Sequence, residues 1–200
     1  MIVWLLAVCS LACVPQATKE DTADTDPAED TDVDLDAEEL AADDARVRAL
    51  TDVLQGDTPC AEPQLVRVLE TVDGDTFHAL PEGADRYFSV RVIGIDTPEV
   101  EHDDPAECYG NEAWAWAEAR LAGRLVWLTF DGECLDDFDR TLAYVIRSND
   151  EDGFFNRALA RNGYATPFPF PLTDTYEDEI AADARAARDE GAGLWSACER

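Results

Sequence analysis

The chain has almost no lysine. Lys19 is the only one among 200 residues, and the other fixed positive charges are fourteen arginines. Against them stand 45 acidic residues, which give a formal net charge of −30. The acidity is not confined to one end, because residues 60–200 hold 30 acids and 12 bases. Such a surface suits high salt and excludes nucleic-acid binding driven by long-range attraction, since phosphate contacts dominate that affinity.

A run of apolar residues long enough to span a bilayer is also lacking. Residues 1–13 are apolar but have only the length of a signal h-region, and small residues precede Cys13. This ending is typical of a bacterial lipoprotein signal with lipidation at Cys13. Cys9 is a poorer candidate, and an ordinary secretory signal is the alternative because no Lys or Arg precedes the apolar run. We expect an exported protein, either lipid-anchored in the envelope or secreted.

An acidic tether follows the signal. Residues 14–37 are rich in Thr, Asp, Ala and Pro, and such a segment cannot bury enough apolar surface to order itself. We predict that it is disordered. Residues 38–59 are predicted to form a short helix and a linker, because Leu40, Val47, Leu50 and Leu54 recur at helical spacing.

Residues 60–200 have the pattern of one folded domain that is mainly β. Five strands are predicted, over residues 64–71, 75–80, 86–95, 125–130 and 141–147, and three helices over residues 111–122, 154–162 and 176–190. Short strands with helices inserted and appended indicate an α+β fold, a five-stranded OB-type barrel with three α-helices.

Two stretches of this domain carry most of the chemical information. VDGDT (72–76) and VRVIGIDTPE (90–99) are apolar strands that end in carboxylates, and the second also contains Arg91. Carboxylates can hold a hard divalent cation, and an arginine can grip a phosphate. On a straight strand Arg91 and Asp96 would lie about 16 Å apart, so both can reach one phosphate only if the strand bends. Gly94 is the predicted bend.

The whole domain resembles the thermonuclease, or staphylococcal-nuclease-like, family. The resemblance rests on six pieces in matching order and spacing: VDGDTF, VRVIGIDTPEV, YGNEAWAWAEARL, DDFDRTLAYV, FFNRALARNGYA and a closing AR…GLW. It implies a five-stranded OB barrel with three helices, and calcium-dependent hydrolysis of DNA and RNA at the 5′-oxygen that leaves 3′-phosphates.

The resemblance also implies a role for each matching residue. Asp75, Asp96 and the backbone carbonyl of Thr97 match calcium ligands, and Asp73 matches an acid behind them. Glu99 matches the residue that activates water, and the scissile phosphate would be held by Arg91 and Arg140. The residues alone leave other interpretations open: the acids around Gly74 as turn formers, Arg91 as a surface residue and Arg140 as an ion-pair partner.

Three phenylalanines stand where the family carries tyrosines that contact the nucleotide. Phe138, Phe168 and Phe170 keep the ability to stack on bases but lose the hydroxyl hydrogen bond. We predict that they contact the substrate; a hydrophobic cover on the barrel is the alternative for Phe168 and Phe170. Asp137 and Asp139 replace the usual lysine and glycine next to Phe138, which predicts weak substrate affinity.

Four cysteines in the domain fit an oxidising compartment. In the fold implied by the resemblance, the loops holding Cys108 and Cys134 flank the active site, so we predict Cys108–Cys134 and Cys60–Cys198 disulfides. A zinc site is disfavoured because no CxxC occurs and the two histidines are remote from the cysteines.

The leading hypothesis is therefore an exported, monomeric, calcium-dependent nuclease whose only link to a membrane would be the N-terminal lipid. The acidity favours two alternatives. One is a catalytically weak OB-type module that binds nucleic acid or another ligand, and the other is an anchored acidic surface protein.

Overall fold

The structure, a computed structural model, describes residues 37–101, 105–148, 150 and 152–198. The predicted signal with Cys13 and all of the predicted tether except residue 37 lie outside the described residues. Within the described part of the chain, no helix is both long and apolar enough to cross a membrane.

Five strands close into a barrel, which confirms the predicted OB-type fold. Neighbouring strands are antiparallel except for one parallel pair, β3 with β6. Alternate residues such as Val66 and Val68 point into an apolar core, as the period of a strand requires. The strand order around the barrel is β1 (Gln64–Thr71), β2 (Thr76–Pro81), β3 (Phe88–Val92), β6 (Thr141–Ile146) and β5 (Leu125–Thr129).

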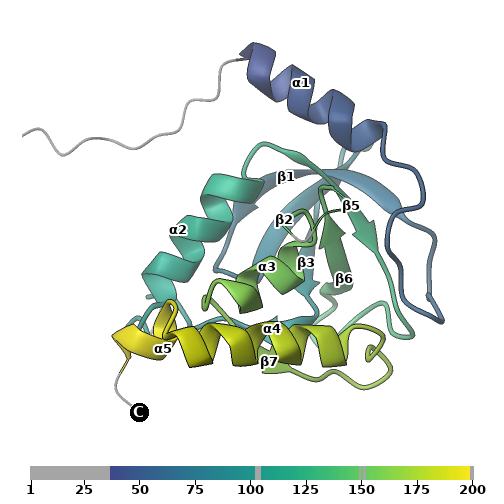
Figure 1. Cartoon of the computed structure of the whole chain (residues 1–200). Coiled ribbons are helices and arrows are strands. Elements are labelled where there is room, and N and C mark those ends of the chain that lie inside the picture. The colour runs from purple at the N-terminus through teal and green to yellow at the C-terminus, as the bar shows by residue number, and fades with distance from the viewer. Residues whose placement is uncertain (1–36, 102–104, 149, 151, 199–200) are drawn as a thin grey trace, which may run out of the picture. The chain divides into compact units, whose positions relative to one another are not determined.

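Five helices accompany the barrel in the described residues: the three predicted for the domain, the short helix predicted before it, and α5, so three is too low a number. One turn, α5, was missed because four residues are too few for helical periodicity to show. The N-terminal helix α1 packs against β5, α2 against β1, and α3 against α4, as Figure 1 shows. The helices are α1 (Ala37–Arg48), α2 (Gly110–Leu121), α3 (Phe155–Arg161), α4 (Glu177–Glu190) and α5 (Leu194–Ala197).

The predicted strand over residues 86–95 is in fact two strands joined by a bend. β3 ends at Val92, and β4 (Gly94–Asp96) leaves the barrel to pair with β7 (Thr166–Phe168). Gly94 has a φ of +81°, a conformation that costs glycine little and other residues more. The bend that the sequence required at Gly94 is therefore present.

The predicted disulfide pairing is wrong. The structure joins Cys60 to Cys134 and Cys108 to Cys198, each pair with a Cα–Cα distance of 5.8 Å. Cys60 lies beside the loop after β5 because its N–H donates to the carbonyl of Asp131 at 2.7 Å. The chain end after α5 returns to the start of α2, where Cys108 lies. Both contacts are non-local, so cysteine spacing did not reveal them.

A buried asparagine ties α3 to the barrel beneath the bend. The Asn156 side chain is fully buried; its Oδ1 accepts from Val145 N at 2.9 Å and its Nδ2 donates to the carbonyl of Ile93 at 2.8 Å. These two bonds join β6 to the turn between β3 and β4, and thus support the bend.

Asn156→Ala should lower the free energy of unfolding by about 3 kcal/mol, because it leaves a buried donor and a buried acceptor without partners. Urea denaturation of the disulfide-bonded protein measures this. Asn162→Ala is the matched control, since Asn162 is exposed at the end of the same helix and bonds only within it, to Ala158. Equal loss in both variants would contradict the assigned role of Asn156.

Candidate functional site

One cleft brings together nine of the predicted site residues. Its volume is about 590 Å³, and it lies among the start of β2, the bend after β3, the loop before β6 and the segment from β7 onward. The predicted residues that line it are Asp73, Asp75, Arg91, Asp96, Glu99, Phe138, Arg140, Phe168 and Phe170. It is also lined by Glu133, Asp136, Asp137, Leu142, Pro171 and Leu172.

Arg91 lies between two of the predicted ligand carboxylates. The Arg91 side chain is buried; its Nη1 forms an ion pair with Asp75 Oδ1, and its Nη2 donates to Asp96 Oδ1 at 2.6 Å. The bend at Gly94 makes this contact between residues five apart possible. Burial lowers the pKa of Arg91, while the charges of Asp96 and Asp73 act in the opposite direction. The hypothesis that Arg91 is a surface residue is therefore wrong.

The two acids around Gly74 are buried and do different things. Asp73 Oδ1 accepts the N–H groups of Asp75 at 2.8 Å and Thr76 at 2.6 Å, so Asp73 does form the turn. Burial raises the pKa of Asp73 above its usual value, and the hydrogen bond from Thr76 opposes this. Asp75 instead points to the next strand, where its Oδ2 accepts the N–H of Thr97 at 2.8 Å and the Thr97 hydroxyl at 3.1 Å.

Arg140 enters the cleft from the loop before β6 and is fixed by Asp136. Its Nε donates to Asp136 Oδ2 at 2.7 Å, and its backbone N–H donates to Asp136 Oδ1 at 2.9 Å. Burial alone would raise the pKa of Asp136, but the hydrogen bonds from Arg140 and Phe138 lower it overall. Asp139 has a φ of +61°, a left-handed backbone conformation that costs glycine less than other residues.

Glu99 lies at the rim of the cleft and is held through its backbone. Its carbonyl accepts the N–H of Glu107 at 2.9 Å, and its own N–H donates to the Glu107 carboxylate at 3.1 Å. Gly110 packs so closely that an added Cβ would lie 2.1 Å from the Glu99 carbonyl oxygen. Burial raises the pKa of Glu99, as do the charges of Asp73 and Asp96.

The three predicted aromatic contacts form the outer wall of the cleft. Phe138 is 79% exposed and Phe168 is 44% exposed, so both present ring surface to solvent. Phe170 meets Phe168 edge to face at 5.1 Å and lies 5.8 Å from the Arg91 guanidinium. Phe138 lies 5.5 Å from the Arg140 guanidinium. Exposed rings beside two arginines suit the stacking of bases whose phosphate lies below.

The chemistry of the cleft fits a hard cation. Seven acids and two arginines line it, so it carries excess negative charge from oxygen donors of the kind that calcium prefers. Among the described residues no cluster of three or more potential metal-binding side chains occurs, because Asp75 and Asp96 meet around Arg91 instead. Asp75 and Asp96 are the predicted ligands that line this cleft, whereas Thr97 lines a neighbouring pocket together with Asp96.

Two positioning residues were missed in the sequence. Asp136 orients Arg140, and Glu107 holds Glu99. Asp136 begins the DDFDR segment that carries Arg140, and an acid four residues before an arginine is a recognisable pairing signal. Glu107 had no such signal, because its contact with Glu99 depends on the course of a loop.

Comparisons with known proteins agree with this geometry. A family model described as "Staphylococcal nuclease homologue" matches residues 89–197. The "Thermonuclease" of Staphylococcus intermedius is 35% identical over 129 residues, which cover 64% of this chain and 74% of that protein. The "Thermonuclease" of Staphylococcus hyicus is 31% identical over 137 residues, 68% of this chain and 78% of that protein. "Probable endonuclease LCL3" of Saccharomyces cerevisiae is 30% identical over 112 residues, 53% of this chain and 40% of that protein.

Proposed function

The chain belongs to the staphylococcal nuclease family, and we propose that it is a calcium-dependent nuclease that cleaves DNA and RNA at the 5′-oxygen and leaves 3′-phosphates. One observation carries the proposal: Arg91 and Arg140 enter a single cleft with Asp75, Asp96 and Glu99. These are the charges that phosphodiester hydrolysis needs, namely two cations for the phosphate and carboxylates for a metal and for a water proton.

Five of the residues that line the cleft act directly in this mechanism. Calcium bound to Asp75 and Asp96 would polarise the phosphate and stabilise its charge. The Arg91 Nη1 and Nη2 groups, which pair with these two carboxylates here, would be available to the phosphate if the carboxylates held a cation. Arg140, already oriented by Asp136, binds a second phosphate oxygen and stabilises the charge that grows during attack. Glu99 accepts the proton of the attacking water.

The substrate strand would lie along the aromatic wall. Phe138 and Phe168 offer exposed rings without hydroxyl groups, so they favour bases of single-stranded regions over any specific sequence. Phe170 is partly buried against the core, as the alternative of a hydrophobic cover expects. The acidic cleft makes affinity depend on the cation, because few arginines are present to attract phosphates.

The proposal is tested by incubating the protein with single-stranded DNA and with RNA, in calcium and in excess chelator. We expect hydrolysis only with calcium and products with 3′-phosphate ends. Binding without cleavage would instead support a weak OB-type binding module, which the excess of acids in the cleft favours. Products with 5′-phosphate ends would contradict the proposed position of cleavage.

Glu107 is proposed to act on catalysis through Glu99. Glu107→Ala should lower kcat about tenfold with little change in KM, because it removes the charge-assisted hydrogen bond to the Glu99 N–H and leaves only the bond between the Glu107 N–H and the Glu99 carbonyl. Glu107→Gln keeps an acceptor oxygen at the same distance and should restore most of kcat. If both variants lose activity equally, the charge of Glu107 matters and not the hydrogen bond. If neither does, Glu107 has no positioning role.

Export is the proposed localisation. Two disulfides support it, since such bonds persist in oxidising compartments. Lipidation at Cys13, the alternative of secretion and the monomeric state remain predictions from the sequence.

A further inference from the structure

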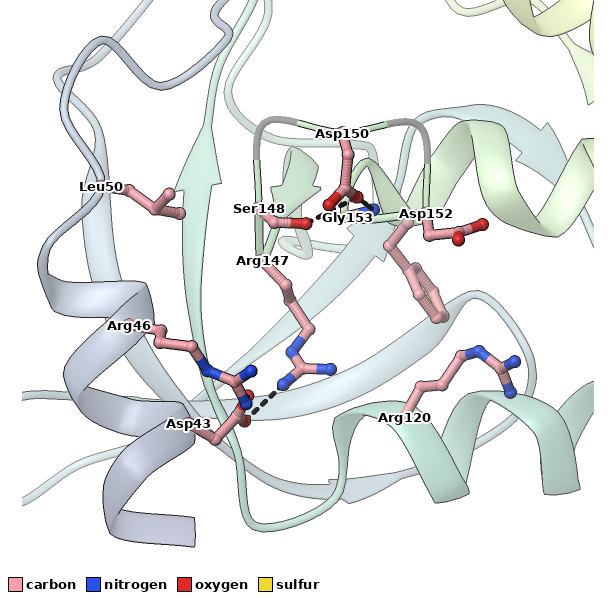
Figure 2. A pocket seen from close by; sticks show the side chains of 10 residues that line it. Asp43, Arg46, Leu50, Arg120, Arg147, Ser148, Asp150, Asp152 and Gly153 are labelled. Atoms are coloured by element: carbon pink, nitrogen blue, oxygen red, sulfur yellow. Dashed lines mark hydrogen bonds and ion pairs between the residues drawn. The ribbon is translucent and has the colours of Figure 1, made fainter. Parts of the chain in front are cut away.

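A second pocket lies at the opposite end of β6 from Arg140. Its volume is about 540 Å³, and it shares no lining residue with the cleft. It is formed by α1, the end of α2, the turn after β6 and the start of α3, as Figure 2 shows. Its lining residues include Arg46, Arg120 and Arg147, which come from three different elements. In a chain with only fourteen arginines, this exceeds the number in the cleft.

The three arginines that line this pocket face three aspartates, Asp43, Asp150 and Asp152, and Arg124 adds a fourth cation beside Asp43. Asp43 of α1 is a single carboxylate that serves three arginines: its Oδ1 accepts from Arg46 at 3.1 Å, and its Oδ2 pairs with Arg124 at 3.3 Å and with Arg147. The enclosed Nε of Arg147 has no hydrogen-bond acceptor among the described residues. This nitrogen is enclosed by protein atoms, so it contributes positive charge beside the pocket and is not itself a contact for a ligand.

Arg120 is not one of the three arginines that pair with Asp43 of α1. Arg120 lies on α2, and its guanidinium stacks on the Trp116 ring at 3.8 Å. Stacking fixes the plane of an arginine and leaves its edge donors available for an acceptor. In Figure 2 the Arg147 side chain extends between Asp43 on one side and Arg120 on the other.

Two acids on the far rim, Asp150 and Asp152, reduce the attraction of the pocket for anions but do not neutralise all of its arginines. Asp150 already accepts hydrogen bonds from the Ser148 hydroxyl at 2.7 Å and the Gly153 N–H at 2.8 Å. Asp152 lies near Arg120 and reduces its attraction for anions. Together with the net charge of −30, these acids weaken the expected binding to a dissociation constant on the order of 1 mM.

We propose that this pocket is an oxyanion site that binds a phosphate group through Arg46, Arg120 and Arg147. Arginine forks match the oxygens of phosphate, and Asp43, which pairs with Arg46 and Arg147 of these three, leaves room for a second negative group. The phosphate can come from free phosphate, from a phosphomonoester or from a nucleic-acid strand. The site requires no divalent cation, which separates it from the cleft.

Calorimetric titration of the full, disulfide-bonded protein tests this site in excess chelator, at low salt and pH 8. The probes are inorganic phosphate, a 3′-mononucleotide and a short oligonucleotide without a terminal phosphate. Binding of the first two alone identifies a monoester site, and binding of the oligonucleotide as well identifies a strand contact. If none of them binds at tens of millimolar, the proposal is overturned.

Variants then locate the binding. Arg46→Gln and Arg120→Gln should each weaken phosphate binding about tenfold, the effect of one charge-assisted hydrogen bond. Neither change removes the Arg124 and Arg147 contacts that hold Asp43. Arg185→Gln, an exposed position on α4, should bind phosphate like the wild type. Loss of binding in Arg185→Gln, or unchanged binding in both pocket variants, would overturn the assignment. Because no step reads nuclease activity, the outcome does not depend on the proposed function.

Discussion

Asp96→Asn should abolish calcium-dependent hydrolysis while the barrel stays folded. The Asp96 side chain is 46% exposed and has one ion-pair partner, Arg91. The change removes a charged ligand from a hard-cation site, so we expect calcium affinity to fall at least about a hundredfold, and activity with it. Calorimetry with calcium and a hydrolysis assay measure the two effects on the same preparation.

The choice of residue and control follows from the contacts. Asp75 is the other predicted ligand, but it also accepts two hydrogen bonds from Thr97, so its replacement would disturb the fold as well. Asp137→Asn is the matched control, because Asp137 lines the cleft, is exposed and is not a predicted ligand. If calcium affinity is unchanged in Asp96→Asn, then Asp96 only pairs with Arg91 and the metal assignment is wrong.

Arg140→Gln should lower kcat by about a hundredfold or more and change KM much less. The charge on the phosphate grows as water attacks, so a cation aimed at it contributes more in the transition state than in the bound substrate. Arg140 suits this test better than Arg91, whose loss would leave two carboxylates without their shared partner. Steady-state kinetics at saturating calcium measure both constants.

A matched control separates the local effect from the change in net charge. Arg86→Gln removes one positive charge from an exposed loop position and should leave both constants near the wild-type values. If Arg140→Gln changes KM alone, Arg140 binds the substrate without contributing to the transition state.

The barrel and the site were predictable because short-range patterns specify them. β1 has the predicted bounds, and β5 and β6 differ from the predicted strands by one residue at the end, since alternation of apolar residues sets a strand locally. The bend at Gly94 followed from chain geometry: two residues five apart had to serve one site. Because the chain bends at Gly94, Arg91 and Asp96 lie in the same cleft although they are five residues apart.

The parts that were not predictable depend on contacts between distant segments. The disulfide pairing follows from the path of residues 56–60 along the loop after β5, which spacing does not encode. β7 contains Pro167 and pairs only with the short β4, so it lacks a strand signal. Asp43 of α1 pairs with Arg46 of the same helix and with Arg124 and Arg147 next to barrel strands. The sequence of α1 did not indicate the two contacts with the barrel, because they join segments that are far apart in the chain.

The central claim is that this cleft hydrolyses phosphodiesters with calcium, and the rate of cleavage of a fluorescent single-stranded DNA as calcium is titrated tests it most directly. The account predicts no cleavage in excess chelator, a saturable rise with calcium in the wild type and in Asp137→Asn, and no rise in Asp96→Asn. Cleavage that persists in chelator, or that rises equally with calcium in Asp96→Asn, would contradict it.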